Sequence, residues 1–323
     1  MKATSHLETV RCPLLPADKD SVGSTRFIYC CGLLLSMRYY QLRDGNSQRL
    51  AVATDDGAYD LTSVKPQLRT FRDLLKAASI ADTAPDKVSA RHLDAAETVS
   101  GQRLKTDATD PVSADEVWAA GVTYQISEEA RKEESDTPEM YLYVHDAERP
   151  EIFFKSTPNR TVGPDEKVGI RADSDWDVPE PELGIVLYEG EVVGYTIGND
   201  MSSRSIEGEN PLYLPQAKVY DRCCSVGPAV VTDIEDPHSL ALSMSIHRDG
   251  ERVYRGETNT SEMKRTCEDL VSYYTAHNAV PELSVLLTGT SLVPDDDFTL
   301  QEGDEITIDI ESIGTLKNSV TVV

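Results

Sequence analysis

The sequence predicts an α+β protein in which a small α+β unit precedes a larger, β-rich domain. Residues 37–104 combine short strand patterns with helical spacing, residues 176–228 have the pattern of strand, turn and strand, and the last hundred residues are rich in strand patterns. We therefore expect an extension over 1–36, a small N-terminal domain over 37–110 and a larger domain over 111–323.

Composition limits the classes of function. The chain has 323 residues, of which 39% are hydrophobic and 27% charged, as in a soluble globular protein. The 31 basic and 56 acidic residues give a formal charge of -25, so we expect neither nucleic acid nor a membrane as a partner. The acidic residues are spread along the chain, which we interpret as a halophile's adaptation to concentrated salt.

The cysteines indicate a reducing compartment. Their spacing matches neither a zinc site nor a disulfide framework, so we expect free thiols and a cytoplasmic protein. The six histidines show no metal-binding spacing and are interpreted as structural or surface residues. The cysteines are Cys12, Cys30, Cys31, Cys223, Cys224 and Cys267.

The first 36 residues differ from the rest of the chain. The apolar run over 27–37 is far shorter than the roughly 20 residues of a membrane span, and no cleavage site follows it. Met37 opens a clear strand pattern. We expect Met37 to be the natural start, with 1–36 either a poorly ordered extension or a start-site artefact.

The N-terminal unit shows no chemistry of its own. Strands are predicted over 39–42, 50–53 and 58–61, and helical spacing begins at Phe71 and resumes over 88–96. The polar segment 106–111 ends in proline and marks the predicted domain boundary.

The larger domain begins with two segments near the predicted site. Residues 126–144 have a polar helical pattern, typical of a surface helix or of a lid. The strand over 149–155 places Glu151 and Lys155 on one face. These two side chains either hold each other in place or shift each other's proton affinity for acid–base work.

Three carboxylates dominate the centre of the chain. Glu180 and Glu182 are two residues apart in a strand and therefore face the same side. A turn over 188–191 allows a second strand to return Asp200 beside them. Three carboxylates with no His or Cys suit Mg²⁺ before Mn²⁺ or Ca²⁺, and the alternative is a solvated acidic strand end.

Two later features extend the candidate site. Lys218 ends a proline-bracketed loop over 209–218, and it either anchors an anionic substrate, moves a proton or pairs with a carboxylate. Gly289 would let backbone N–H groups approach an anion closely. No nucleotide-binding fingerprint is present in the sequence.

Several motifs resemble the fumarylacetoacetate hydrolase superfamily over residues 116 to the C terminus. They are GxTY at 121–124, FFK at 153–155, PEPEL, GYTIGND, Lys218, TGT and GDEITIDIESIGTLKN. The strings RPEIFFKSTPNR, PEPEL and ENPLYLPQAKVY are similar to the archaeal 2-keto-3-deoxy-D-arabinonate dehydratases of pentose degradation. The resemblance implies a catalytic domain of the family's C-terminal type, a mixed β-sandwich roll, and homo-oligomers (dimer or tetramer).

The resemblance also implies roles for individual residues. Mg²⁺ is expected at Glu180, Glu182 and Asp200, with no other cofactor. Catalytic roles are expected for Glu151, Lys155 and Lys218, although which of them starts the reaction stays open. Contacts with the substrate, a small 2-oxo acid, are expected from Lys218, Thr290 and Tyr124.

One departure from the superfamily bears on the reaction. Hydrolytic members have a histidine three residues after the tyrosine, whereas this chain has Ser127, a poor base. The implied reaction is therefore dehydration of a 2-keto-3-deoxypentonate, derived from arabinose or xylose, to 2,5-dioxopentanoate. The alternatives are acylpyruvate hydrolysis, oxo-acid decarboxylation or tautomerisation, or a protein that binds metal or oxo acid without catalysis.

Overall fold

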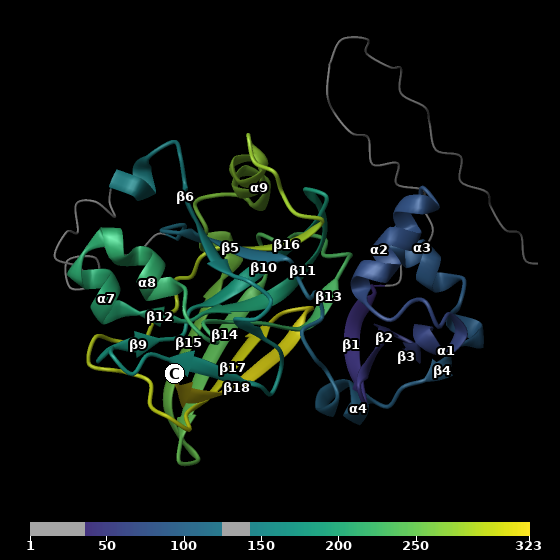
Figure 1. The fold of residues 1–323 in the computed structure, drawn as a ribbon, viewed down its shortest axis with the longest axis horizontal. Helices are drawn as coiled ribbons and strands as arrows, with labels where there is room; N and C mark the ends of the chain where they lie inside the picture. The colour runs from purple at the N-terminus through teal and green to yellow at the C-terminus, as the bar shows by residue number, and fades with distance from the viewer. Residues whose placement is uncertain (1–35, 125–142) are drawn as a thin grey trace, which may run out of the picture. The chain divides into compact units, whose positions relative to one another are not determined.

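Three β-sheets organise the computed structural model, which describes residues 36–124 and 143–323 (Figure 1). The predicted extension over 1–36 falls, except for Ser36, outside the described residues. The β-rich architecture with several short helices confirms the predicted α+β class.

The largest sheet has eleven strands in the order β4-β3-β2-β1-β13-β11-β10-β16-β5-β6, with β7 beside β13. Its strands are β1 (Arg38–Asp44), β2 (Ser47–Thr54), β3 (Gly57–Asp60), β4 (Glu97–Thr98), β5 (Glu116–Gly121), β6 (Glu151–Ser156), β7 (Thr161–Val162), β10 (Pro181–Tyr188), β11 (Glu191–Asp200), β13 (Cys224–Val231) and β16 (Leu283–Leu287). Because β1 pairs with β13, the predicted N-terminal domain and the larger domain share one sheet. The proposed boundary at residue 110 stays a prediction.

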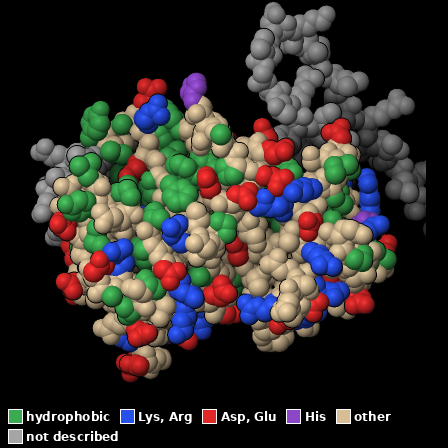
Figure 2. Space-filling view, viewed as in Figure 1, with side chains coloured by type: hydrophobic (Ala, Val, Ile, Leu, Met, Phe, Trp, Pro, Cys, Tyr) green, Lys and Arg blue, Asp and Glu red, His purple; other side chains and the backbone are tan. Residues whose placement is uncertain are grey.

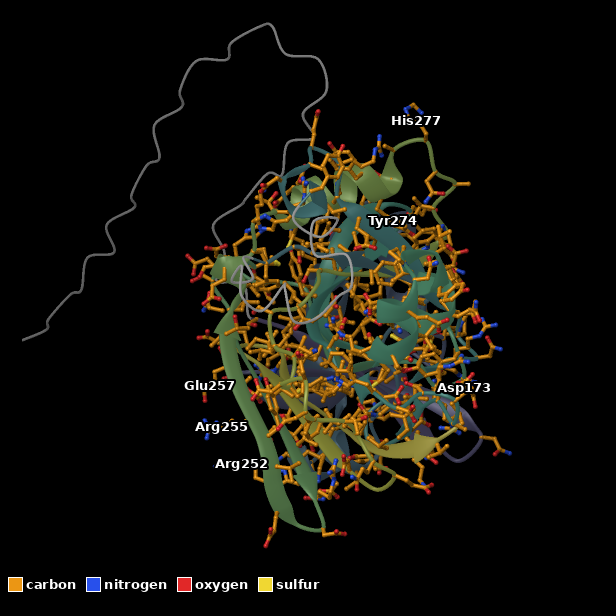
Figure 3. The ribbon with its side chains drawn as sticks, turned by 90° about the vertical axis from the view of Figure 1, so that its left-hand side faces the viewer. Asp173, Arg252, Arg255, Glu257, Tyr274 and His277 are labelled. Carbon is orange, nitrogen blue, oxygen red and sulfur yellow. The ribbon has the colours of Figure 1, made fainter. Side chains whose placement is uncertain are left out.

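The second sheet has the order β15-β14-β17-β18-β8, and β9 pairs with β12 separately. At its edge, β15 points Arg252, Arg255 and Glu257 outward (Figure 3), and charged side chains of this kind discourage pairing with another strand. The strands are β8 (Lys167–Ile170), β9 (Asp177–Val178), β12 (Ser202–Ser203), β14 (Ala241–Arg248), β15 (Glu251–Asn259), β17 (Glu305–Ile310) and β18 (Gly314–Val322).

The helices are short, and their ends follow the sequence. Thr70 and Asp73 form a reciprocal capping box that starts α2, whose predicted apolar face, including Phe71, is buried. The helical spacing over 88–96 gives less helix than predicted, because α3 ends at Ala90 and a 3₁₀ turn follows. The helices are α1 (Leu61–Val64), α2 (Phe71–Ile80), α3 (Pro85–Ala90), α4 (Gly101–Thr106), α7 (Arg204–Glu209), α8 (Leu214–Lys218) and α9 (Cys267–Thr275), with 3₁₀ turns η1 (Leu93–Ala95), η2 (Pro211–Tyr213) and η3 (Thr260–Glu262).

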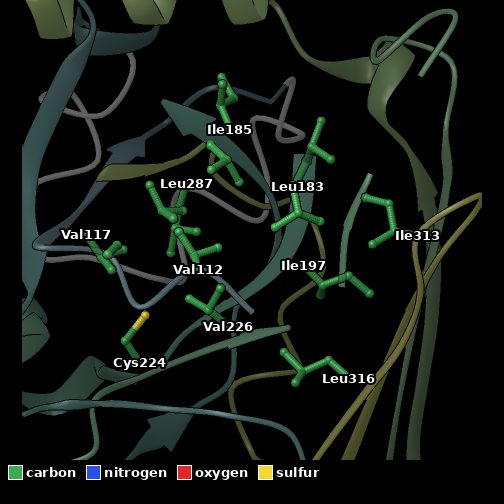
Figure 4. Packing of buried hydrophobic residues seen from close by; sticks show 14 of the residues in the cluster. Val112, Val117, Leu183, Ile185, Ile197, Cys224, Val226, Leu287, Ile313 and Leu316 are labelled. Atoms are coloured by element: carbon green, nitrogen blue, oxygen red, sulfur yellow. The ribbon is translucent and has the colours of Figure 1, made fainter. Parts of the chain in front are cut away.

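One buried hydrophobic cluster includes residues of both larger sheets, and Figure 4 shows part of it. Leu183 and Ile197 of the β10–β11 hairpin and Leu316 of β18 belong to this cluster. Strand β10 is buried from Pro181 to Leu187, so its hairpin with β11 is held on both faces by packing. This rigid hairpin supports the residues at its open end.

The surface matches the composition. Acidic and basic side chains are interspersed over the face in Figure 2 without a large patch of one sign. The described cysteines, Cys223, Cys224 and Cys267, are free, as predicted, and all three are buried. None of the helices in the described parts of the chain has the length and apolar character required to cross a membrane.

The packing of Phe71 yields a first prediction. Its ring is fully buried and lies 5.3 Å from the Tyr39 ring, between centroids. Phe71→Ala should lower the free energy of unfolding by about 3–5 kcal/mol, because it removes buried apolar surface and leaves a cavity. Urea unfolding at fixed salt measures the change, and Ile80→Ala, on the exposed end of α2, is the control. Equal stabilities of the two variants would contradict the assigned core.

Candidate active site

The β10–β11 hairpin brings the three predicted carboxylates together. Glu182 is opposite Gly198 in the antiparallel register, and the Asp200 N–H donates to the Glu180 carbonyl at 2.9 Å. Ligand atoms of Glu180, Glu182 and Asp200 all lie within 4.8 Å of one another, and all three residues are buried. The geometry rules out a solvated acidic strand end.

These carboxylates lie in a cavity of about 610 Å³. Its walls come from the ends of β5, β6, β10 and β11, from helices α7 and α8, which pack together with β12 (Figure 1), and from the loop after β16. The structure therefore brings most of the predicted site residues into one space. The cavity is lined by Ala120, Gly121, Val122, Glu151, Phe153, Glu180, Glu182, Asp200, Arg204, Glu207, Leu214, Lys218, Gly289, Thr290, Ser291, Val293, Pro294, Asp295, Asp296 and Asp297.

Lys218 stands between two of the carboxylates. Its Nζ donates to Glu180 Oε2 at 2.7 Å, to Asp200 Oδ2 at 3.3 Å and to Ser202 Oγ at 2.6 Å. Burial alone would lower the pKa of Lys218, but the neighbouring Asp200 and Glu180 raise it well above its usual value. Lys218 is therefore protonated at neutral pH and pairs with the carboxylates. It also lines the cavity.

Glu180 is held in its charged form. Arg204 Nη2 donates to Glu180 Oε1 at 2.9 Å, opposite the contact from Lys218. Burial raises the pKa of Glu180, but Lys218 and then Arg204 outweigh it and lower the pKa to about 2. Sequence reasoning missed Arg204, although its place four residues after Asp200 could have suggested it.

Glu182 has the opposite environment. The Gly289 N–H donates to Glu182 Oε2 at 2.6 Å, so the anion that the Gly289 backbone contacts is this carboxylate. Burial, followed by the charges of Asp200 and Glu180, raises the pKa of Glu182 well above its usual value. Buried carboxylate oxygens that repel one another are the donor set that a hard divalent cation requires, so these residues fit Mg²⁺.

Glu151 occupies the wall beside the carboxylate cluster. It pairs with Gly121 across β5 and β6, and a Cβ atom at position 121 would lie 2.1 Å from Glu151 Oε2. Burial and then the charge of Glu207 raise the pKa of Glu151 to about 7, with Lys218 opposing the shift. Glu151 can therefore both take and give a proton near neutral pH.

Lys155 lies behind the cavity wall. It is fully buried, its Nζ is 2.5 Å from Asp200 Oδ1, and it donates to the carbonyls of Met201 (2.8 Å) and Lys218 (2.5 Å). The predicted partnership with Glu151 is wrong, since the ion pair of Lys155 in the described residues is with Asp200. Its contacts fit a residue that positions Asp200 and Lys218.

The two predicted substrate contacts differ in placement. Thr290 lines the cavity, and its Oγ1 accepts from the Leu292 N–H at 3.0 Å. Tyr124 is fully buried and does not line the cavity, and its hydroxyl has no hydrogen-bond partner among the described residues. A direct contact between Tyr124 and substrate stays a prediction.

Other sequence features are outside the described residues or were missed. Ser127 and most of the helical pattern over 126–144 fall within 125–142, which the structure does not describe. Glu207 and the loop Asp295–Asp297 line the cavity, but sequence reasoning assigned them no role. Both approach the site only through tertiary packing.

Comparison with known proteins connects this geometry to a family. The model of the fumarylacetoacetate (FAA) hydrolase C-terminal family matches residues 116–321. The chain is 63% identical over 289 residues to a probable 2-keto-3-deoxyxylonate dehydratase of Haloferax volcanii, covering 89% of this chain and 100% of the relative. It is 44% identical over 215 residues to 2-dehydro-3-deoxy-D-arabinonate dehydratase of Saccharolobus solfataricus, covering 64% and 72%.

A solved structure of similar fold contains ligands. It is a 2-keto-3-deoxy-D-arabinonate dehydratase complexed with magnesium and 2,5-dioxopentanoate, 35% identical, with a TM-score of 0.71 over 88% of this chain and 99% of that one. More distantly, the human mitochondrial oxaloacetate tautomerase FAHD2A is 30% identical over 190 residues, covering 52% of this chain and 58% of the relative.

The close approach of Gly121 to Glu151 yields a second prediction. Gly121→Ala should lower the free energy of unfolding by about 1–3 kcal/mol, because the new methyl group overlaps the Glu151 carboxylate. The same change in a Glu151→Ala background should lower the free energy of unfolding much less, since the carboxylate that the methyl group overlaps is then absent. Gly101→Ala, where no atom lies within 4 Å, is the control. Equal costs in both backgrounds would show that Gly121 does not constrain Glu151.

Proposed function

Because this chain belongs to the fumarylacetoacetate hydrolase family, we propose that it dehydrates a 2-keto-3-deoxypentonate to 2,5-dioxopentanoate in pentose catabolism. The observation that carries the proposal is the convergence of Glu180, Glu182 and Asp200 with Glu151 in one cavity. The identity with dehydratases over the full length of one relative supports it.

In this proposal, Glu180, Glu182 and Asp200 hold Mg²⁺, and Mn²⁺ or Ca²⁺ can replace it. Bound there, the ion supplies Lewis-acid polarisation of the substrate's 2-oxo group, which acidifies the hydrogens on C3. Lys218 and Arg204 keep Glu180 ionised at all physiological pH values. Lys155 fixes the position of Asp200, and Thr290, which lines the cavity, contacts the substrate.

Glu151 performs the proton transfers. Its carboxylate takes a proton from C3, the C4–O bond breaks, and the departing hydroxide receives a proton from Glu151 or Lys218, giving water and a C3=C4 enone. A proton then leaves C5 and another returns to C3, which gives the C4=C5 enol. Loss of the proton on the C5 oxygen and protonation of C4 convert this enol to the C5 aldehyde. The raised pKa of Glu151, about 7, suits both directions of transfer.

The same proposal includes the setting of the enzyme. It acts on a small 2-oxo acid in the cytoplasm of a halophile and forms a homo-oligomer, a dimer or tetramer. The buried free thiols support the compartment.

Product analysis tests the proposed reaction. Purified protein in molar KCl with Mg²⁺ and 2-keto-3-deoxypentonate should release 2,5-dioxopentanoate, detected by trapping its aldehyde. Chelation of the metal should stop the release, and added Mg²⁺ should restore it. Substrate consumption without an aldehyde product would instead favour another reaction of the family.

The metal assignment yields a third prediction. Glu182→Gln should abolish metal-dependent turnover and weaken Mg²⁺ binding, because it replaces an anionic ligand with a neutral amide. Calorimetry measures the binding, and aldehyde trapping measures the turnover. Glu191→Gln makes the same change in the turn of the same hairpin, on an exposed residue, and should alter neither. A fully active Glu182→Gln variant would remove the metal assignment.

The role of Glu151 yields a fourth prediction. Glu151→Gln should lower kcat by about 10²–10⁴-fold while Mg²⁺ affinity changes little, because the variant loses the base but no proposed ligand. In the parent enzyme, kcat/KM should rise with pH and level off above a midpoint near 7, since deprotonated Glu151 takes the C3 proton. The variant should lack this rise. A parent profile that is flat from pH 5 to 8 would contradict Glu151 as the base.

A further inference from the structure

The charges that line the cavity are distributed unequally. Among the described residues, both cationic lining side chains contact the carboxylate cluster: Arg204 at Glu180, and Lys218 at Glu180 and Asp200. The remaining charged lining residues are all acidic. They are Glu151, Glu207, Asp295, Asp296 and Asp297.

The metal end of the cavity attracts an anion. Three ligand carboxylates, the three cationic side chains of Lys155, Lys218 and Arg204, and one divalent ion leave a net positive charge there. That charge attracts the carboxylate of a 2-oxo acid. A second carboxylate on the substrate would have to lie among the acidic residues of the other walls, where like charges repel it without an opposing cation among the described residues.

Glu207 supplies a second, independent observation. It comes from α7, and its Oε2 atom is buried without a hydrogen-bond partner in the described part of the chain. A buried acceptor left without a donor is costly, so such an atom requires an explanation. A hydroxyl group of a bound molecule in the same cavity is a suitable donor, whereas a carboxylate has no proton to donate at neutral pH.

Glu207 also lies close to the reacting region. Glu207 and Glu151 line the same cavity, and among the acidic neighbours Glu207 contributes most to the raised pKa of Glu151, ahead of Glu180 and Asp200. A hydroxyl group held by Glu207 would therefore be near the residue that is proposed to move protons. This placement fits the tail of the substrate, which begins at the carbon that loses its hydroxyl group.

We propose that Glu207 determines specificity by accepting a hydrogen bond from a hydroxyl group on the substrate's tail, so that the cavity selects hydroxylated 2-oxo monoacids and rejects 2-oxo dicarboxylates. This inference rests on the proposed function, because it takes the 2-oxo acid to be bound at the carboxylate cluster. It adds the chemical class that the tail must have.

The experiment compares three five-carbon ligands that differ only at C5. They are 2-oxopentanoate (methyl), 5-hydroxy-2-oxopentanoate (hydroxymethyl) and 2-oxoglutarate (carboxylate). Calorimetry on the full chain in Mg²⁺ and molar KCl measures each Kd without requiring turnover. The hydroxylated ligand should bind at least about ten-fold more tightly than 2-oxopentanoate, and 2-oxoglutarate at least about ten-fold more weakly.

Two variants assign these preferences to Glu207. Glu207→Gln removes the charge but keeps an acceptor oxygen, so it should bind 2-oxoglutarate more tightly and retain most of the preference for the hydroxyl group. Glu207→Leu removes both and should abolish that preference. Glu209→Gln, on the same helix but outside the cavity lining, is the control and should behave like the parent. The Kd for Mg²⁺ alone checks that each variant retains an intact metal end.

The outcomes separate this inference from the proposed function. Parent protein that binds 2-oxoglutarate as tightly as 2-oxopentanoate would overturn the inference, even if 2-keto-3-deoxypentonate is dehydrated. A hydroxyl preference that survives in Glu207→Leu would overturn the assignment to Glu207. Conversely, the predicted selectivity without formation of 2,5-dioxopentanoate would support the inference and reject dehydration.

Discussion

The structure depends on the mutual repulsion of three buried carboxylates and on what opposes it. Glu180 is stabilised by Arg204 and Lys218, and Asp200 by Lys155 and Lys218. Glu182 receives one backbone N–H, so its pKa is raised by burial and by the two neighbouring carboxylates. Cationic side chains therefore offset the negative charges of Glu180 and Asp200, whereas the negative charge of Glu182 stays unfavourable. A divalent cation bound by all three offsets that charge as well, which connects metal binding directly to the energetics of the fold.

The scaffold explains why such a cluster can persist. The hairpin of β10 and β11 lies inside the largest sheet, between β13 and β16, and its apolar side chains are buried in the core. Repelling side chains at its open end cannot move apart unless this packing is lost. Lys155 reinforces the arrangement from behind the cavity wall, since its Nζ donates to the Lys218 carbonyl and thereby connects β6 to the end of α8.

How much of this was predictable follows from the range of each interaction along the chain. The convergence of Glu180, Glu182 and Asp200 depends on strand alternation and one tight hairpin, both of which are local and visible in the sequence. The ion pair of Lys155 is with Asp200 and not with Glu151. The sequence does not show this contact, because β6 and β11 are separated in the sheet and the two side chains meet only through tertiary packing. Arg204 and Glu207 lie on a six-residue helix whose orientation depends on packing against α8 and β12. No periodicity in the sequence could therefore predict that these side chains reach the site.

The unequal distribution of charge links these elements to chemistry. Among the described residues, the cationic lining side chains are all at the metal end of the cavity. The proposed orientation of a bound oxo acid therefore places its carboxylate and 2-oxo group at the cluster and its tail toward Glu151 and Glu207. In that orientation C3 and C4 follow the 2-oxo group along the ligand toward Glu151, the proposed acid–base residue. The carbon–carbon bond beyond a second carbonyl, which a hydrolase attacks, has no counterpart in a 2-keto-3-deoxypentonate. The electrostatics that hold the carboxylates in place therefore also favour the orientation that the proposed loss of water requires.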